Sequence, residues 1–399
     1  MQSRCTFALW LFLFCLISPL AVTQVYKVTD LGPLAPTAIN NWGQVAGNLD
    51  GHAFIWTQWG SLDLGILAGG TFSSAAAIND FGIVAGTADG PGTVISTDPS
   101  LPNQECSDLT QPFVWTARNG MQGLGGVTPP FSDEIYPYWC EQFRFDGTGI
   151  NARGQVVGFV GEYSSYQWGF LWTRANGITV FGGSWIPTVV NAISNTGQIV
   201  GQNSQDNTYP LTLWIGHATS WKNGVATDLG TLGGEADMGY PFGYSSSANG
   251  INDLGQVVGW STTTPIPASP PGPAWYGQSP VHALLWAATG GMRDLGTLPG
   301  DTYSSASKIN FFGQVIGTSG NTAAVDPVAY NEFFDNRYEV IGRPFAWTQR
   351  SGMQDLNTLI SAKSGWVLNS ATGINFWGQI VGSGTLNGKP HGFLLTPKF

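Results

Sequence analysis

Nine residues, Ile251-Asn-Asp-Leu-Gly-Gln-Val-Val-Gly259, recur with small changes seven times along this chain of 399 residues. The other copies span 39–47, 78–86, 150–158, 193–201, 309–317 and 374–382. Their general form is Ile-Asn-x-x-Gly-Gln-Val-x-Gly, with Ile83 in place of Gln and Ser194 in place of Asn. Apolar residues on both sides of an Asn-x-x-Gly turn predict a β-hairpin. Seven copies of one unit indicate a repeat fold.

Each copy continues with two further strand-like segments. The first has the form of His-Ala-Phe-Ile-Trp-Thr at 52–57, and the second ends in Asp-Leu-Gly, as at 63–65. The aromatic end of the first segment returns at Trp115, Trp172, Trp214, Trp286 and Trp347. A Gly turn separates the two segments. Each copy therefore predicts four short antiparallel strands, here called a, b, c and d, which is the composition of a propeller blade.

The two ends of the chain predict how the ring closes. The seventh copy stops at Thr396, after strand c, whereas Val25-Tyr-Lys-Val-Thr-Asp-Leu-Gly32 reads as a strand d without a unit of its own. We therefore expect an all-β, seven-bladed β-propeller with four-stranded blades, closed by pairing the N-terminal strand with the last blade. Closure leaves no unpaired edge at the seam. An open β-solenoid, the alternative, explains neither the stray strand nor the aromatic strand c.

These elements resemble a known family. The Ile-Asn-Asp-x-Gly-Gln-Val-Val-Gly, His-Ala-Phe-x-Trp-Thr and Asp-Leu-Gly-x-Leu-Gly-Gly patterns are similar to those of the bacterial extracellular HAF-repeat proteins. The resemblance covers nearly the whole chain after its first residues. It implies secretion and a repeat fold, and it implies no activity and no catalytic residue.

The first 23 residues are predicted to be a signal peptide. Arg4 supplies the positive charge, residues 8–20 are mostly apolar, and small residues follow at 21–23. A transmembrane reading is weaker, because the run is shorter than the ~20 residues that a span needs. Residues 24–399 are then expected to form one propeller domain of seven repeats. We expect secretion, with the periplasm as the alternative, and no membrane span after cleavage.

Signal cleavage would leave two cysteines, Cys106 and Cys140. An exported compartment permits disulfides, and both residues lie in insertions that should share one face of the ring. We therefore expect a Cys106–Cys140 disulfide. Two free thiols are the alternative.

Charge limits the partners. The chain carries 15 Lys+Arg against 25 Asp+Glu, a net charge of -10. This balance argues against nucleic acid and against an anionic membrane surface. We expect a monomer whose partner is a glycan or an extracellular protein.

Connection lengths predict two different faces. The a–b and c–d turns are short and lie together on what we call the turn face. The b–c and d–a connections lie on the opposite, insertion face, and they include the long segments 87–111, 127–146, 261–279 and 319–343. Most of the acidic residues also lie there. Long loops on a rigid scaffold commonly carry function, so we predict the ligand site on the insertion face.

The candidate ligand-binding residues on that face are acids, aromatic rings and one arginine: Asp133, Glu134, Tyr136, Trp139, Glu141, Arg144, Tyr240, Tyr244, Asp301 and Tyr303. Rings cover the apolar faces of sugars, and carboxylates accept hydrogen bonds from hydroxyls. The alternatives are a solvated acidic rim and rings that pack the loops against one another.

Two functions fit this pattern. The first is a secreted binding module. The alternative is a carbohydrate-active enzyme, a polysaccharide lyase or glycoside hydrolase, that uses paired acids such as Asp301 and Asp335 at the ~5–9 Å separation of glycosidase carboxylates. The chain shows neither a calcium loop nor Cys/His metal spacing, so we expect no metal and no cofactor. His52, His282 and His391 alternate with Pro at the start of strand c and are predicted to be structural.

Overall fold

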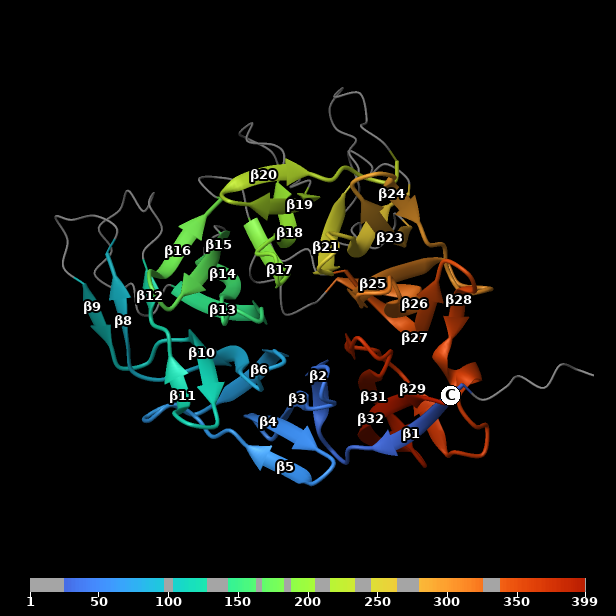
Figure 1. Ribbon diagram of the computed structural model, residues 1–399, viewed down its shortest axis with the longest axis horizontal. Coiled ribbons are helices and arrows are strands. Elements are labelled where there is room, and N and C mark those ends of the chain that lie inside the picture. Colours follow the sequence, from blue (N-terminus) through green and yellow to red (C-terminus); the bar gives the residue numbers. More distant parts are fainter. Residues whose placement is uncertain are drawn as a thin grey trace, which may run out of the picture.

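The chain forms a ring of antiparallel sheets, each running outward from the centre (Figure 1). The computed structural model describes residues 25–96, 103–127, 143–162, 167–182, 188–204, 216–233, 245–263, 280–325 and 338–398. In these segments, no helix is both long enough and apolar enough to span a bilayer.

Six sheets have four strands each, and each sheet contains one repeat copy. In order from strand a to strand d they are β2 (Ala35–Ile39), β3 (Val45–Leu49), β4 (His52–Thr57) and β5 (Gly60–Asp63); β6 (Ser73–Ile78), β7 (Val84–Ala88), β10 (Gln111–Thr116) and β11 (Gly120–Gly123); β13 (Phe143–Ile150), β14 (Val156–Glu162), β15 (Gln167–Thr173) and β16 (Gly177–Phe181); β17 (Thr188–Ile193), β18 (Ile199–Ser204), β19 (Gly216–Lys222) and β20 (Val225–Asp228); β21 (Ser246–Ile251), β22 (Val257–Thr262), β23 (Val281–Ala287) and β24 (Gly291–Asp294); and β25 (Tyr303–Ile309), β26 (Val315–Val325), β27 (Tyr338–Thr348) and β28 (Gly352–Asp355).

The seventh copy closes the ring with the N-terminal strand. β29 (Trp366–Leu368), β30 (Gly373–Ile374), β31 (Ile380–Leu386) and β32 (Lys389–Pro397) are completed by β1 (Tyr26–Asp30), which pairs with β32 from Tyr26↔Pro397 to Asp30↔Phe393. The short 3-10 helix η2 (Leu356–Leu359) leads from β28 into this sheet, and the Val25 N–H donates to the Leu359 carbonyl at 3.0 Å. The predicted closure is confirmed.

The number of sheets differs from the prediction. All-β structure and four-stranded blades are confirmed, but the described chain has eight sheets and not seven. The eighth has three strands, β8 (Gly92–Ile95), β9 (Gln104–Cys106) and β12 (Gly126–Val127), and β8 and β9 lie at the periphery of the ring (Figure 1). β8 and β9 come from the insertion between β7 and β10, and β12 comes from the connection between β11 and β13. Both connections lack the motif and were expected to be loops.

The motif asparagine holds both its own turn and the next blade. The Asn310 Oδ1 accepts from the N–H groups of Phe312 and Gln314, both at 3.0 Å. Its Nδ2 donates to Gln314 Oε1 at 2.6 Å and to the carbonyl of Asn375, the same position in the next blade, at 3.1 Å. The turn glycine, Gly313, has φ +77°, which a residue with a side chain adopts only with strain.

This blade-to-blade bond recurs around the ring. It joins the asparagine side chain of one blade to the main-chain carbonyl of the next, in the order Asn40 to Asn79, Asn79 to Asn151, Asn151 to Ser194, Asn252 to Asn310, Asn310 to Asn375 and Asn375 to Asn40. Ser194, whose side chain is too short, bonds Thr196 of its own turn instead, at 2.9 Å. The Asn at the second motif position is therefore an interblade clasp.

The glycine at the ninth motif position is required because strand b packs closely against strand a. Strand a has a β-bulge, in β25 between Ala306 and Lys308. A Cβ at Gly317 would overlap the carbonyl of Ser305 on that strand. The same overlap with strand a occurs in the other copies, so the position excludes every larger residue.

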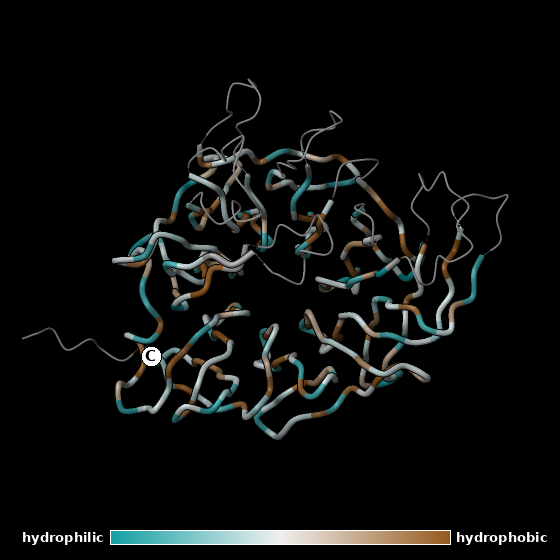
Figure 2. Tube along the Cα trace, turned by 180° about the vertical axis from the view of Figure 1, so that it is seen from behind, coloured by the Kyte–Doolittle hydropathy of each residue, from teal (hydrophilic) through white to brown (hydrophobic). Residues whose placement is uncertain are grey.

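The hydrophobic core lies between the blades. Buried residues form several clusters around the ring, and hydrophobic segments are distributed over all the sheets (Figure 2). The strand-c phenylalanines Phe113, Phe170, Phe345 and Phe393 are each fully buried. Burial of an aromatic ring of this kind stabilises by roughly 2–3 kcal/mol.

The predicted strand c of the fourth copy was wrong by several residues. β19 pairs Trp221 with Ile199, as β4 pairs Trp56 with Val45. Trp221 is therefore the aromatic end of this strand. Trp214, predicted for that role, lies outside the described residues. After His217 this copy has Ala-Thr where the other copies commonly have Ala-Phe. The sequence pattern therefore did not identify residues 217–221 as strand c.

Removing residues 24–31 should lower the melting temperature by more than about 5 °C. The deletion exposes β32 as an edge and removes Tyr26 and Leu31, which are both buried and each contribute ~2–5 kcal/mol. Thermal melting followed by circular dichroism tests this, with Lys27→Ala, an exposed side chain on the same strand, as control. A deletion variant that melts with the wild type would contradict closure.

Asn310→Ala should lower the free energy of unfolding by about 2–4 kcal/mol, because two turn N–H groups and the Asn375 carbonyl lose their buried partner. Denaturant unfolding measures the loss. Asn119→Ala, at an exposed c–d turn, is the matched control and should change stability by less than about 0.5 kcal/mol. Equal losses of unfolding free energy in Asn310→Ala and Asn119→Ala would show that the clasp contributes no more than an exposed turn residue.

Candidate functional site

Most of the predicted insertion-face residues lie outside the described segments. These are Asp133, Glu134, Tyr136, Trp139, Glu141, Tyr240 and Tyr244, together with Cys140. The Cys106–Cys140 disulfide therefore stays a prediction. Of the described candidates, Arg144 pairs with Asp146 at 2.9 Å on the surface. Tyr303 packs against Trp260, Val281 and Val340.

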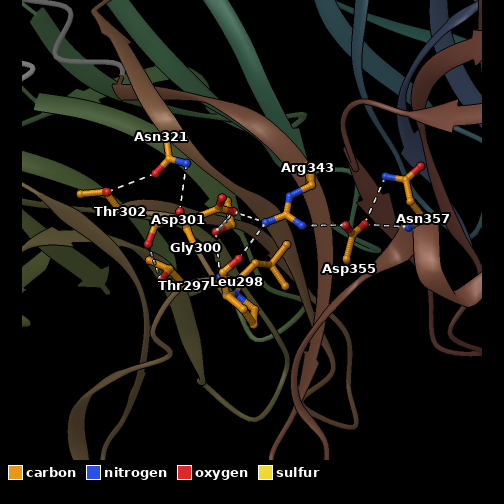
Figure 3. Close-up of polar contacts among 11 residues, drawn as sticks. Thr297, Leu298, Gly300, Asp301, Thr302, Asn321, Arg343, Asp355 and Asn357 are labelled. Atoms are coloured by element: carbon orange, nitrogen blue, oxygen red, sulfur yellow. Dashed lines mark hydrogen bonds and ion pairs between the residues drawn. The ribbon is translucent and has the colours of Figure 1, made fainter. Parts of the chain in front are cut away.

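Asp301 belongs to an ionic bridge on the insertion face (Figure 3). Arg343, on β27, donates to the Oδ2 of Asp301 at 2.9 Å and to the Oδ2 of Asp355, on β28, at 3.2 Å. The Asp301 side chain is 7% exposed and also accepts from Ser319 at 2.9 Å. Hydrogen bonding to Asp301 raises the pKa of Arg343 further. The bridge ties the loop before β25 to strands c and d, so it is structural. Asp335, the acid predicted to pair with Asp301 in an enzyme, lies outside the described residues.

Four histidines each hold a strand-d aspartate at the same face. The Nδ1 atoms of His217, His282 and His391 lie 2.8 Å from Asp228, Asp294 and Asp30. His52 and Asp63 are 2.9 Å apart. Each aspartate also accepts from a backbone N–H two residues later. These aspartates therefore anchor the turns that follow strand d. His217 is an addition to the three histidines predicted at the start of strand c.

The turn face carries a central pocket. Its volume is about 290 Å³, and it is lined by residues at the ends of all seven innermost strands. Five clasp asparagines belong to this lining: Asn40, Asn79, Asn252, Asn310 and Asn375. The residue after each clasp adds polar groups, among them Asn41, Asp80, Asn195 and Asp253. The Asn41 Nδ2 donates to Asp80 at 2.8 Å, and the Asn195 Nδ2 donates to Asp253 at 2.9 Å. The pocket thus combines amide and carboxylate groups at the axis of the ring.

Exposed aromatic residues surround part of this pocket. Trp42, Phe81, Phe312 and Trp377 occupy the outermost a–b turn position in four copies and are 78%, 75%, 65% and 60% exposed. Phe376 links two of them, with ring centroids 4.7 Å from Phe312 and 5.1 Å from Trp377. The Trp377 Nε1 donates to the Asn41 carbonyl at 3.0 Å, so its indole reaches the first blade. We call Phe312, Phe376, Trp377, Trp42 and Phe81 the aromatic arc. It covers four consecutive blades.

One cation lines the inner strands beneath these turns. Lys308, on β25, occupies a position where the other copies have only Ala or Gly. Its Nζ donates to the Asn249 carbonyl of the preceding blade at 3.4 Å. Desolvation by the surrounding blades lowers the pKa of this amine. The side chain therefore adds to the contacts between these two blades, which include the bond from Asn249 Nδ2 to the Ala306 carbonyl at 2.9 Å.

Sequence reasoning missed the turn-face pocket because it treated the a–b turns as connections. A signal was present. Residues at the tip of a short turn are commonly Asn, Asp, Gly or Ser, whereas this chain places Trp42, Phe81, Phe312 and Trp377 there. Large exposed rings at equivalent positions cannot serve the core of a blade, and clustered exposed apolar surface marks interaction sites.

Comparisons with known proteins identify no family for this chain. No protein-family model and no curated protein matches the chain. Among solved structures, it is similar to virginiamycin B lyase from Staphylococcus aureus, at 10% identity and a TM-score of 0.47, over 92% of this chain and 99% of that one. It is also similar to an oligogalacturonate lyase in complex with manganese, at 12% identity and a TM-score of 0.48, over 94% of this chain and 93% of that one. Likenesses this distant do not indicate an activity.

The His–Asp pairs predict acid sensitivity. Burial raises the pKa of Asp228 and Asp294, but hydrogen bonds from His217, from His282 and from backbone N–H groups outweigh it, so the pKa of each carboxyl lies below the usual 3.8. A carboxyl whose pKa is lowered by folding stabilises fully above its unfolded pKa and loses this contribution as the pH falls through its folded pKa.

Asp294→Asn should therefore destabilise the protein at pH 6 and approach wild-type stability towards pH 2. Thermal melting across this range measures the difference. Asp50→Asn, at an exposed turn whose positive φ (51°) Asn tolerates, serves as control and should show no such convergence. A difference in melting temperature between Asp294→Asn and wild type that stays constant at all pH values would contradict a stabilising role for the ionised Asp294.

Proposed function

We propose that this protein is a binding module that holds a neutral glycan at the central pocket of the turn face. The observation that carries the proposal is the aromatic arc beside a pocket lined with amides and carboxylates. The proposed site differs from the expectation based on loop length and charge, which favoured the insertion face.

The lining matches the chemistry of a sugar. Sugar rings offer apolar C–H faces, which stack on Trp and Phe, and hydroxyls, which exchange hydrogen bonds with amides and carboxylates. The pocket volume, about 290 Å³, is near the lower limit for small-ligand sites. A chain end would enter the pocket, and the following residues would lie across the aromatic arc.

Charge favours a neutral glycan over an acidic one. Asp80 and Asp253 both line the pocket, and the whole chain carries a net charge of -10. A uronic acid or a sulfated sugar would meet repulsion there. The fourth motif position, at the tip of the a–b turn, is a cation in the third copy, Arg153, and is uncharged in the other six.

We further propose how many blades the ring has and where the protein acts. We infer a seven-bladed ring to which the three-stranded sheet of β8, β9 and β12 is an accessory. Residues 1–23 would direct export, and the domain of residues 24–399 would act outside the cytoplasm as a monomer of the HAF-repeat type. An enzyme on the insertion face gains no support from the described residues, because the Asp301 carboxylate is already paired with Arg343.

Isothermal titration calorimetry with cellohexaose, laminarihexaose and xylohexaose tests the function. At least one should bind, and Trp42→Ala and Phe81→Ala should each weaken it by about fivefold or more, since an anchoring ring contributes upward of ~1 kcal/mol. Trp59→Ala is the matched control, because Trp59 is 88% exposed on the same face but belongs to an outer c–d turn. Absence of binding by all three sugars, or equal losses in Trp59→Ala, would overturn the proposal.

A further inference from the structure

A second ring of hydrogen bonds, outside the clasps, joins the a–b turns around the pocket. In it, the backbone N–H of the residue after the clasp donates to the side-chain oxygen of the equivalent residue in the next blade. Four such bonds are present: Phe376 to Asn41 at 2.8 Å, Asn41 to Asp80 at 2.9 Å, Ala152 to Asn195 at 2.7 Å and Asn195 to Asp253 at 2.8 Å.

Three positions of this outer ring lack an acceptor. The N–H groups of Asp80, Asp253 and Phe311 face neighbours that carry no side-chain oxygen, namely Ala152, Phe311 and Phe376. Among the described residues, no protein acceptor bonds these three N–H groups. All three residues line the pocket. The sequence therefore leaves three backbone donors at the pocket wall where the repeat geometry elsewhere pairs them.

We propose that oxygens of the bound ligand complete this ring at Asp80, Asp253 and Phe311. The inference rests on the proposed function and names the contacts that select the ligand. Asp253 and Phe311 belong to consecutive blades, and Asp80 lies three blades from each. The three N–H groups would therefore bond ligand oxygens on two sides of the pocket.

The three N–H donors and the aromatic arc would then contact different parts of the ligand. Phe311 belongs to the same ring cluster as Phe312 and Phe376, at centroid distances of 5.6 and 5.8 Å. A sugar stacked on this cluster therefore has the Phe311 N–H beside it. Hydroxyl and ring oxygens accept such bonds without the charge that Asp80 and Asp253 would repel. Stacking gives affinity, and the three donors require oxygens in a defined arrangement.

Ala152→Asn tests the ring without removing an aromatic residue. Asn at this position should accept from the Asp80 N–H, as Asn195 accepts from Ala152. Ala152→Leu is the control, since Leu has a similar size and no acceptor. The readouts are amide hydrogen exchange at single-residue resolution by NMR and calorimetry with the hexasaccharide that binds best.

In free wild type, the Asp80, Asp253 and Phe311 amides should exchange faster than those of Asn41, Ala152 and Asn195. The hexasaccharide should slow all three. Ala152→Asn should slow the Asp80 amide without ligand and weaken binding about tenfold, a loss that exceeds that of Ala152→Leu. A sugar that binds through Trp42 and Phe81 but leaves the three amides unprotected would overturn this inference and leave the proposed function standing. Absence of binding by every hexasaccharide would overturn both.

Discussion

The ring depends on one side chain used six times, the clasp asparagine. Its carbonyl oxygen accepts from two N–H groups of its own turn, and its amide nitrogen donates to the next blade. Local and long-range structure are thus fixed by the same residue. Because a buried amide that loses its partners costs ~1–3 kcal/mol, the turn and the blade contact stabilise each other. This coupling explains why the Asn-x-x-Gly element varies least while the connections vary most.

The repeat made the fold largely predictable from sequence. The strand pattern, the closure by residues 25–32 and the anchoring aspartates follow from short-range patterns that seven copies reinforce. The three-stranded sheet could not be predicted, because β8 and β12 belong to two separate connections without any motif and pair across strands c and d of the second blade. Trp214 was misassigned because the fourth copy has Ser194 and an altered strand c, so two weak signals coincided.

The insertion-face site expected from the long acidic loops stays a prediction, because most of its residues lie outside the described segments. Of its described residues, Asp301 is held by Arg343 and Ser319. The turn face looked uniform because its turns are short. What the pattern could not show is that seven equivalent strand ends converge on one pocket. Convergence makes a pocket out of residues such as Asp80 and Asp253, which lie far apart in the chain.

Closure by β1 sets the order in which the chain can reach its native state. The ribosome delivers Tyr26 long before its partner Pro397. Until β32 is made, β1 lacks its pairing partner, and the growing arc of blades keeps two open edges. Contacts between residues far apart in sequence form slowly, and open edges invite pairing between molecules. The ring is therefore vulnerable to aggregation from the synthesis of β1 until the synthesis of β32.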